Sequence, residues 1–289
     1  MMLTVFTPTY NRAGYLKRVY DSLIAQECRD FEWLIVDDGS TDNTSQVVQT
    51  FIDQNMISIR YICKENGGKH TAHNEAIKHA KGEWFVCVDA DDYLSSNAVQ
   101  RICNAAKQIT DNSGIAAYKQ DTEGKRLSNP FPENVDCCRS SELSLKYGCR
   151  GEFTFVFPTE IARKYPFPVF PGERFVGENV VYDRIERECK MVLLSETITV
   201  CEYLGEGYTS NFDKLLKHNP CGFCLYFMQR IDLMPSLVSK LVCAGKYWCF
   251  RWVSKNKTLR YAGEHRFLCA LGWPVGLIFR VYYKALRGF

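Results

Sequence analysis

The sequence is poor in the residues that characterise disordered and fibrous chains. Glycine and proline together account for only 29 of the 289 residues, whereas 46% of the residues are hydrophobic. Disordered, collagen-like and low-complexity chains have the opposite composition, so these classes are excluded. The length predicts one large domain, or one domain with a sizeable extension.

Long hydrophobic runs are missing as well. The longest, residues 267–279, has 13 residues and is interrupted by two glycines and a proline, whereas a helix that spans a bilayer needs about 20 apolar residues. The opening residues contain neither a basic segment nor a long apolar one, and they indicate a first strand rather than an export signal. We therefore expect a cytoplasmic chain that does not cross a membrane.

The 14 cysteines lack the arrangement of a disulfide framework or of a zinc site. Disulfide frameworks are typical of short secreted chains, and this chain is long and has no export signal. Cys221 and Cys224 have the spacing of half a zinc site, but no second CxxC and no matching histidine pair accompanies them. We interpret the cysteines as reduced thiols in a reducing compartment.

Charge is unevenly distributed, although the net charge is only +3. Residues 240–289 carry ten Lys or Arg and a single acid, Glu264, so this segment has a charge of +9 and the preceding residues sum to −6. Such an asymmetry predicts an acidic catalytic body and a basic tail that is attracted to something anionic.

Apolar segments of strand length alternate with helical patterns along the first part of the chain. We predict strands over 3–7, 31–36, 57–62, 84–88, 114–119 and 153–157, and helices over 15–24, 47–52 and 71–80 and from Asn179. Alternation of this kind predicts a parallel sheet buried on both faces. Residues 112–151 are expected to form a variable region over the ligand site, and the chain after Tyr203 is predicted to be helical.

Acidic residues follow two of the predicted strands, at 37–38 and at 89–92. Ligands of open parallel sheets bind beyond the carboxyl ends of the strands, so we expect these acids to face a common ligand. Asp89 and Asp91 form a D-x-D pair, and Mg²⁺ or Mn²⁺ binds carboxylates and completes its shell with phosphate oxygens. The alternative is that these acids are solvated, or that Asp92 caps the next turn.

Two further segments are candidates for nucleotide contacts. A carboxylate at Asp38 can accept hydrogen bonds from a base imide or from sugar hydroxyls. The loop 66–69 offers backbone N–H groups and the Lys69 cation to a phosphate. His70 and His73 flank this loop, either as phosphate contacts or as ordinary helix histidines.

These segments, in this order, resemble the family 2 glycosyltransferases of the GT-A fold over roughly the first 200 residues. The segments that carry the resemblance are Thr-Pro-Thr-Tyr-Asn-Arg at 7–12, Val-Asp-Asp-Gly-Ser-Thr-Asp at 36–42, Asn-Gly-Gly at 66–68 with Asn74, and Gly-Glu-Trp at 82–84 leading to Asp-Ala-Asp-Asp at 89–92. The fold implied is α/β, with a Rossmann-like, mostly parallel nucleotide-binding sheet and a helical, basic C-terminal extension.

The resemblance implies a role for each residue of the donor site. Pro8 and Tyr10 would flank the nucleotide base, and Asp38 would bind the uracil edge. Asp89 would approach the ribose or the metal, and Asp91 would coordinate the Mn²⁺ or Mg²⁺ that holds the diphosphate. The implied reaction is an inverting transfer of a sugar from a nucleotide-diphosphate donor, most often a UDP-sugar.

The catalytic base of this family usually lies in an acidic pair at the start of a helix. Glu178 occupies that place, but Asn179 stands where the family commonly has the aspartate that acts as base. We therefore predict Glu178 as the base, with Asp183 as the substitute candidate. Tyr203 and residues 205–207 lie where the family often has a loop that closes over donor or acceptor.

Other classes fit the sequence less well. A Rossmann dehydrogenase or a sugar nucleotidyltransferase would need a glycine-rich loop after the first strand, and residues 7–11 do not form one. The alternative function is that of a non-enzymatic scaffold with the same fold, because Asn179 replaces the expected acid. The acidic active face argues against nucleic acid as the substrate.

We predict a glycosyltransferase domain over 1–205 and a helical region over 206–289. The basic, aromatic C-terminal segment is typical of a helix that lies in the plane of an anionic membrane surface. The alternative is that this helix packs its apolar face on the rest of the protein. The membrane interpretation predicts a peripheral protein on the inner face of the cell membrane, with a saccharide or lipid-linked saccharide as acceptor in cell-surface polysaccharide synthesis.

Overall fold

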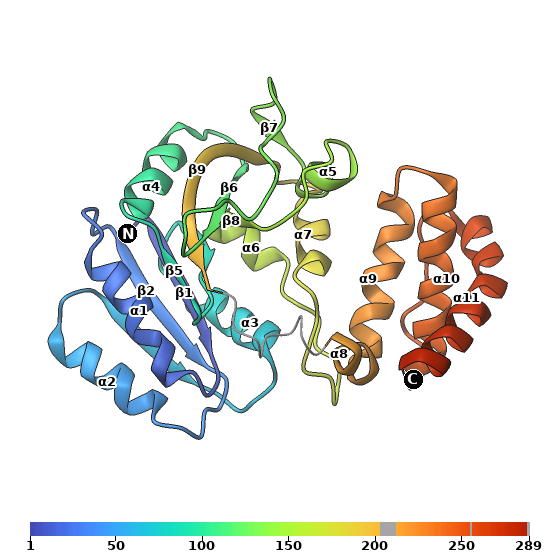
Figure 1. Cartoon of the computed structure of the whole chain (residues 1–289), viewed down its shortest axis with the longest axis horizontal. Helices are drawn as coiled ribbons and strands as arrows, with labels where there is room; N and C mark the ends of the chain where they lie inside the picture. The colour runs from blue at the N-terminus through green and yellow to red at the C-terminus, as the bar shows by residue number, and fades with distance from the viewer. Residues whose placement is uncertain (203–211, 255, 288–289) are drawn as a thin grey trace. The chain divides into compact units, whose positions relative to one another are not determined.

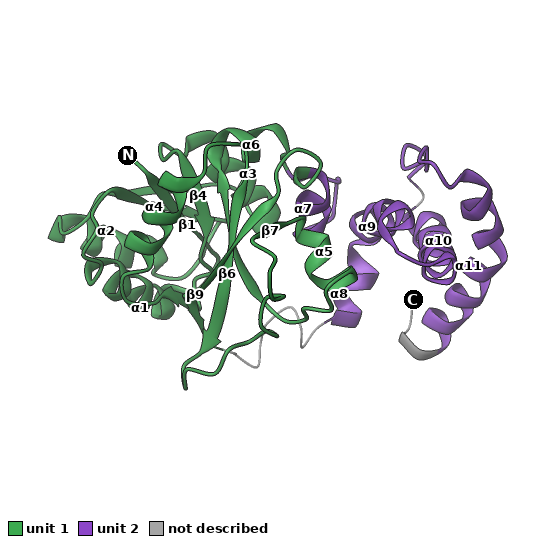
Figure 2. Cartoon of the chain, turned by 90° about the horizontal axis from the view of Figure 1, so that it is seen from above, with its two compact units in different colours: residues 1–166, 185–204 green, residues 167–184, 205–289 purple. Residues whose placement is uncertain are grey.

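A computed structural model describes residues 1–202, 212–254 and 256–287 of the chain, with side chains up to residue 285. Contacts within the chain divide it into two compact units, which Figure 2 colours separately. The sheet unit consists of Met1–Pro166 and Ile185–Leu204, and the helical unit of Phe167–Arg184 and Gly205–Phe289. Residues 167–184 thus belong to the helical unit by their contacts, although the predicted domain division lies after residue 205.

The sheet unit contains a nine-stranded sheet (Figure 1). Its strands are β1 (Leu3–Thr9), β2 (Phe31–Asp37), β3 (Ile59–Cys63), β4 (Trp84–Cys87), β5 (Asp92–Leu94), β6 (Gly114–Asp121), β7 (Cys137–Cys138), β8 (Phe153–Pro158) and β9 (Met191–Cys201). The order is β3-β2-β1-β4-β8-β6-β9-β5, and β7 pairs with β9 outside this path.

The half of the sheet formed by the first four strands in this order is parallel throughout. In the other half, β6 and β9 are parallel, whereas β8 is antiparallel to both of its neighbours and β5 is antiparallel to β9. The expectation of a parallel sheet therefore holds for the half that follows the βα alternation. Parallel neighbours require a crossover between them, and α1, α2 and α3 connect the four strands of the first half in this way.

Helices cover the sheet on both sides. They are α1 (Ala13–Ile24), α2 (Thr44–Gln54), α3 (Lys69–His79), α4 (Ala98–Gln108), α5 (Ser140–Leu145) and α6 (Thr159–Lys164). In α1, the side chains of Leu16, Val19, Tyr20 and Leu23 are buried. Their spacing of three and four residues places them on one face of the helix, which explains why this segment forms an amphipathic helix against the sheet.

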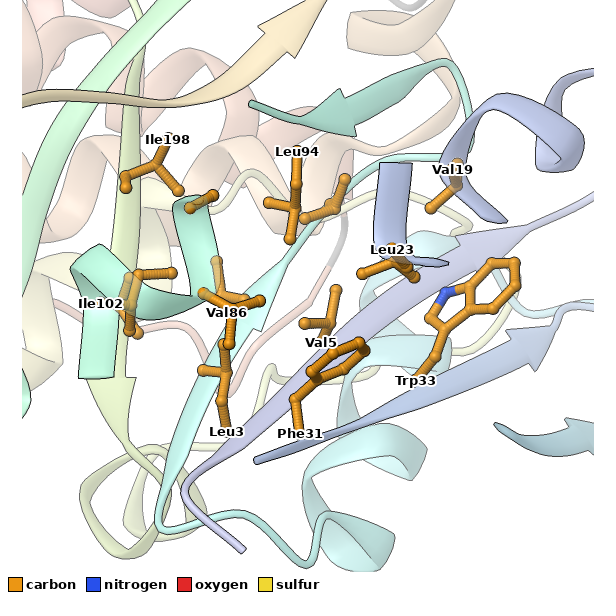
Figure 3. Close-up of a cluster of buried hydrophobic side chains, with 14 of the residues drawn as sticks. Leu3, Val5, Val19, Leu23, Phe31, Trp33, Val86, Leu94, Ile102 and Ile198 are labelled. Carbon is orange, nitrogen blue, oxygen red and sulfur yellow. The ribbon is translucent and has the colours of Figure 1, made fainter. Parts of the chain in front are cut away.

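The hydrophobic core of the sheet unit combines side chains of the strands with side chains of α1, α2 and α4. Figure 3 shows part of it, with Leu23 of α1 and Ile102 of α4 beside the strands. Leu3 and Val5 of β1 and Trp33 of β2 are completely buried in it. The indole Nε1 of Trp33 donates a hydrogen bond to Thr7 Oγ1 at 3.0 Å, so its one polar group is satisfied within the core. The strands β1 and β2, whose ends form the edge with the acids, are therefore fixed by a well-packed core.

The helical unit contains α7 (Asn179–Ile185, which ends in the sheet unit), α8 (Phe212–His218), α9 (Pro220–Leu233), α10 (Leu237–Ser254) and α11 (Arg266–Arg287). These helices confirm the predicted helical C-terminal region. Phe223, Tyr247 and Phe250 lie in a second hydrophobic core. A Cβ atom on Gly272 of α11 would lie 2.5 Å from the Cβ atom of Ala244 in α10, so glycine allows these two helices to pack closely. No described helix is both long enough and apolar enough to cross a membrane.

Several elements of the sheet unit were not predicted from the sequence, namely β5, β7, β9, α4, α5 and α6. β9 was not predicted, because Ser195, Glu196 and Thr197 interrupt its apolar pattern. Asp92, considered above as a cap, is instead the first residue of β5 and pairs with Cys201 of β9. The strands that pair with β5 and β9 include ones distant in the sequence, so only the assembled sheet reveals these two strands.

Candidate functional site

The carboxyl ends of the parallel strands meet at one edge of the sheet. Thr9 at the end of β1 pairs with Asp37 at the end of β2, and Asp37 pairs with Cys63 at the end of β3. The Asp38 N–H donates a hydrogen bond to the Thr9 carbonyl at 2.9 Å. The segments after β1 and β2, which carry the family resemblance, therefore lie next to each other.

The loops after β1 and β2 are tied together by hydrogen bonds. The Asn11 N–H donates to Ser40 Oγ at 2.8 Å, and the Thr41 N–H donates to Asn11 Oδ1 at 2.8 Å. Asn11 has a φ of 51°, which asparagine tolerates better than most residues. Asp37 Oδ1 also accepts a hydrogen bond from the Ser40 N–H at 2.7 Å. Several residues of the two motifs thus shape the loops of the site.

Asp38 is buried and holds the loop after β3. Its Oδ1 accepts hydrogen bonds from Lys64 Nζ at 2.6 Å and from the Gly67 N–H at 3.0 Å, and its Oδ2 accepts one from the Gly68 N–H at 2.7 Å. An ionised carboxylate has about four acceptor positions, so one remains at Oδ2 for a further donor. Sequence reasoning missed Lys64, although its place directly after β3 matches that of the acids after β2 and β4.

Lys69 is the first residue of α3 and forms an ion pair with Asp89. Its Nζ lies 2.7 Å from Asp89 Oδ1 and 2.8 Å from Oδ2. Burial raises the pKa of Asp89, but the cations of Lys69 and Lys119 outweigh burial and hold the pKa below its ordinary value. The predicted phosphate-binding cation and the first acid of the D-x-D pair are therefore direct partners.

Asp91 and Asp92 have different environments although they are adjacent. Burial, followed by the negative charge of Asp89, raises the pKa of the half-buried Asp91. Burial also raises the pKa of Asp92 to about 6, against the opposing effect of Lys119, whose Nζ lies 3.2 Å from Asp92 Oδ2. Lys119 was not identified from the sequence, because its pairing depends on β6 lying two strands away from β5 in the sheet.

The Asp89–Asp91 pair fits a divalent cation that brings its own phosphate ligands. Among the described residues, no three His, Cys, Asp or Glu side chains are grouped closely enough to hold a metal ion. Mg²⁺ and Mn²⁺ bind through one or two carboxylates and take further oxygens from a phosphate substrate. Because the charge of Asp89 raises the pKa of Asp91, a cation between these two carboxylates would relieve their repulsion.

The residues predicted to flank the base differ in accessibility. Pro8 is buried within β1, where it pairs with Val36. Tyr10 follows the strand and has an exposed fraction of 46%. The tyrosine ring is therefore accessible to a base at this edge, whereas Pro8 is part of the buried strand that precedes it.

His70 and His73 are buried on the inner face of α3. The His73 ring packs edge-to-face against Phe6 and Phe85, with ring centroids 5.6 and 5.2 Å apart. Burial lowers the pKa of His70 to about 4, and the weaker influences are Asp38, which raises the pKa, and Lys64, which lowers it further. These environments favour the interpretation of the two residues as core histidines of the helix.

The residues predicted for catalysis lie in the helical unit. Glu178 is exposed and directly precedes α7, and its carbonyl accepts hydrogen bonds from the Val181 and Tyr182 N–H groups. Asp183 is buried, and its Oδ1 accepts a hydrogen bond from Arg230 Nη2 of α9 at 2.9 Å. The predicted closing loop, Tyr203 and residues 205–207, lies outside the described residues.

The segment that carries Glu178 is anchored to α9 at two places. The buried carboxylate of Glu173 accepts hydrogen bonds from the Cys221 and Gly222 N–H groups in the first turn of α9, at 2.6 and 2.9 Å. The Asp183–Arg230 ion pair forms the second anchor. An acid at a helix N-terminus satisfies otherwise unpaired N–H groups and interacts favourably with the helix dipole. Sequence reasoning missed Glu173 and Arg230, because their partners are about 48 residues away in the chain.

The sequence matches the family described as "Glycosyl transferase family 2" over residues 4–152. The uncharacterized glycosyltransferase EpsJ of Bacillus subtilis is 32% identical over 130 residues, which are 45% of this chain and 38% of that protein. The chondroitin synthase of Pasteurella multocida is 39% identical over 99 residues, which are 34% of this chain and 10% of the synthase. The chain thus spans less than half the length of these curated relatives.

Solved structures of similar shape cover nearly the whole chain. S. aureus TarS (residues 1–349) in complex with UDP-GlcNAc has a TM-score of 0.59 and 17% identity, over 99% of this chain and 92% of that one. The mannosyltransferase PcManGT from Pyrobaculum calidifontis, in complex with GDP-Man and Mn²⁺, has a TM-score of 0.56 and 19% identity, over 99% and 83%. This likeness confirms the predicted GT-A fold. Because the family match extends over half of the sequence, the chain belongs to glycosyl transferase family 2.

Proposed function

We propose that the chain transfers a sugar, with inversion, from a nucleotide-diphosphate donor to a hydroxyl group of a saccharide or lipid-linked saccharide. The observation that carries the proposal is the array of Asp38, Lys69, Asp89 and Asp91 along one end of a parallel sheet. UDP-sugars are the first choice of donor, and the solved complex of TarS with UDP-GlcNAc supports this choice.

The base of the donor would be read at Asp38. Three of its acceptor positions are used by Lys64, Gly67 and Gly68, which hold the carboxylate in place. The remaining position at Oδ2 suits the imide N–H of uracil, which cytosine lacks. Tyr10, exposed at the end of β1, offers its ring as a stacking surface for the same base.

The diphosphate would be held near Lys69, Asp89 and Asp91. A Mn²⁺ or Mg²⁺ ion bound there would neutralise the charge that develops on the departing diphosphate. Asp91 is the first metal ligand in this proposal, because Asp89 already has the Lys69 ammonium as a counterion. The Lys69 ammonium places a second positive charge at the same strand end, which favours an anionic leaving group.

Glu178 would remove the proton from the acceptor hydroxyl as that oxygen attacks the anomeric carbon. An inverting transfer needs such a base on the side of the sugar opposite the leaving group, and an exposed carboxylate can serve in this role. We assign Asp183 a positioning role instead, because its carboxylate is buried and bonded to Arg230. The anchors at Glu173 and Asp183 would then determine where Glu178 lies.

We place this reaction in the synthesis of cell-surface polysaccharide, with the protein bound peripherally to the inner face of the cell membrane. The names of the Pasteurella relatives, chondroitin synthase and hyaluronan synthase, support a polysaccharide product. The basic C-terminal segment supports a membrane location, because anionic lipids attract Lys and Arg.

A second candidate is a catalytically weak scaffold with the same fold, which Asn179 in place of an acid favours. Thermal unfolding of the full chain with UDP, GDP or CDP, each with and without Mn²⁺, separates the two functions. A ligand at about 100 times its Kd raises the free energy of unfolding by roughly 2.7 kcal/mol, which a melting curve resolves. We expect a shift with UDP that requires Mn²⁺.

The matched variants for this experiment are Asp91→Ala and Glu123→Ala. Glu123 is an exposed acid in the turn after β6, so its variant should keep the full shift, whereas Asp91→Ala should lose it. Release of UDP from a panel of UDP-sugars then reports turnover. The absence of a shift with every nucleotide would favour the scaffold, and a shift without turnover would favour a binding protein.

A further inference from the structure

Exposed apolar side chains are concentrated on α11. Among the described residues, fifteen large hydrophobic side chains are exposed, and seven of these lie on this one helix. Six of them form what we call the α11 apolar face: Phe267, Leu271, Leu277, Ile278, Val281 and Tyr282. Single exposed apolar residues are ordinary on protein surfaces, but a row of this length marks an interaction site.

The α11 apolar face is distinct from the face that packs within the helical unit. Cys269, Gly272, Gly276 and Tyr283 are buried, and α11 lies alongside α10 (Figure 1). Positions 267, 271, 278 and 282 recur at helical spacing on another side of the helix. The helix therefore has two apolar faces, of which intramolecular packing covers one.

The charged residues of α11 itself all have the same sign. Neither α10 nor α11 contains an Asp or a Glu. The exposed cations of α11, Arg266, Arg280 and Lys284, belong to the segment that carries a charge of +9. A partner for this face must therefore accept large apolar side chains and also supply negative charge.

We propose that the α11 apolar face lies on an anionic lipid surface, with the helix axis parallel to the membrane plane. The helix has 22 residues and is about 33 Å long, so the whole face can enter the interfacial layer at one depth. Its cations would then reach the lipid phosphates. A second copy that meets this face with its own α11 is a poorer partner, because it would bring the same positive charge.

This proposal concerns the helical unit and does not depend on the identity of the sugar donor. It deepens the peripheral location proposed above, because it names the surface that contacts the lipid. Binding of UDP and Mn²⁺ in the sheet unit is the independent reference in the test, so a failure of lipid binding is distinguishable from a failure of the proposed reaction.

Flotation of the full chain with lipid vesicles tests the proposal. The probes are vesicles of phosphatidylcholine alone and vesicles of phosphatidylcholine mixed with phosphatidylglycerol. We expect the chain to float with the mixed vesicles, and at least about tenfold less with phosphatidylcholine alone, because the attraction of several cations is lost. Raising the salt concentration should release the chain from the mixed vesicles.

The key variant carries Ile278→Glu and Val281→Glu, whose side chains have exposed fractions of 68% and 69%. Its matched control carries Met56→Glu and Val169→Glu, each with an exposed fraction of 58%. We expect the α11 variant to lose flotation by about tenfold or more, because two carboxylates oppose both burial and anionic lipid. The control variant, which adds the same charge elsewhere, should lose far less.

Three results would overturn the proposal. The wild-type chain could fail to float with either vesicle, or the α11 variant and its control could float equally well. In the third result, the wild-type chain does not float, and sedimentation shows that it is a dimer which the α11 substitutions dissociate. The α11 apolar face would then be an interface between two copies of the chain. Circular dichroism and the UDP–Mn²⁺ melting shift of each variant show whether it is folded.

Discussion

The two units support their functional surfaces in different ways. At the strand ends of the sheet unit, the acids have partners within the fold: Asp38 binds Lys64 and two backbone N–H groups, and Asp89 binds Lys69. On α11 of the helical unit, large apolar side chains are exposed, and the charged residues of this helix are all cations. The acids of the first surface are therefore held by bonds within the fold, whereas the apolar side chains of the second are exposed.

The helical unit also contains a preorganised segment of its own. Residues 167–184 come directly after β8 and α6 of the sheet unit in the sequence. Glu173 and Asp183 nevertheless attach this segment to α9 of the helical unit. A segment held by a helix N-terminus and by a buried ion pair has few alternative positions. Besides the α11 apolar face, the helical unit therefore provides the bonds that fix the segment carrying Glu178.

The largest expected effect is a loss of transfer rate on substitution of Glu178, the residue of the helical unit that we propose as the base. Glu178→Gln keeps the shape of the side chain but removes the base, so we expect transfer to slow by about 10²- to 10⁴-fold. UDP binding should stay unchanged, because the donor residues lie in the sheet unit. Steady-state transfer and a UDP–Mn²⁺ melting curve measure the two quantities. With Glu123→Gln as control, equal transfer rates in the two variants would exclude Glu178 as the base.

A slightly smaller effect is expected when the anchor of the segment is broken. Arg230→Met leaves the buried carboxylate of Asp183 without its cation, which costs about 3–5 kcal/mol of unfolding free energy. Urea unfolding measures this loss. The double variant Arg230→Met with Asp183→Leu should recover much of it, because apolar side chains suit a buried site. A loss no larger than that of the exposed Arg260→Met would show that the ion pair does not hold the segment.

The sheet unit has its own buried titratable group in His70. Its pKa falls from an ordinary value of 6.5 to about 4, so protonation favours the unfolded chain. The stability from neutral His70 is complete above about pH 6.5 and is lost as the pH falls toward 4, by roughly 3 kcal/mol in total. We expect His70→Gln to remove this part of the pH dependence. Unfolding at pH 7 and at lower pH, with His218→Gln as control, measures the difference, and parallel profiles for wild type and His70→Gln would contradict the assignment.

The smallest expected effect on the free energy of unfolding comes from a surface ion pair whose geometry is similar to that of Asp183 and Arg230. Lys17 and Asp21 lie four residues apart on α1, with Nζ and Oδ2 separated by 2.6 Å. Both side chains are exposed, so Asp21→Asn should change the unfolding free energy by less than about 0.5 kcal/mol. Urea unfolding of Asp21→Asn and of Arg230→Met under the same conditions compares the two losses of unfolding free energy. A surface loss equal to the buried one would mean that burial does not distinguish these pairs.

Local patterns were sufficient to predict the first half of the sheet. β1, β2 and β4 are short apolar runs followed by polar residues, and such runs are strands because both faces of a parallel sheet are buried. The placement of Asp38, Asp89 and Asp91 at the strand ends follows directly from those predictions, since parallel strands end at the same edge. The GT-A fold and the family followed from the order of these motifs.

Other features depend on residues that are distant in the sequence. β9 has a polar middle and is a strand only because β6, β5 and β7 pair with it. The pattern of α3 did not show that His70 and His73 are buried, since burial depends on which face of the helix meets the sheet.

The same division applies to the candidate site. Residue types and their position after a strand predicted Asp89 and Asp91, because ligands of a parallel sheet bind beyond the strand ends, and the family resemblance predicted Glu178. The partners of these groups, Lys69 beside Asp89 and the Glu173 and Arg230 anchors around Glu178, were decided by the tertiary structure. A pairing energy depends on distance and burial, and both arise only when separate segments of the chain come together.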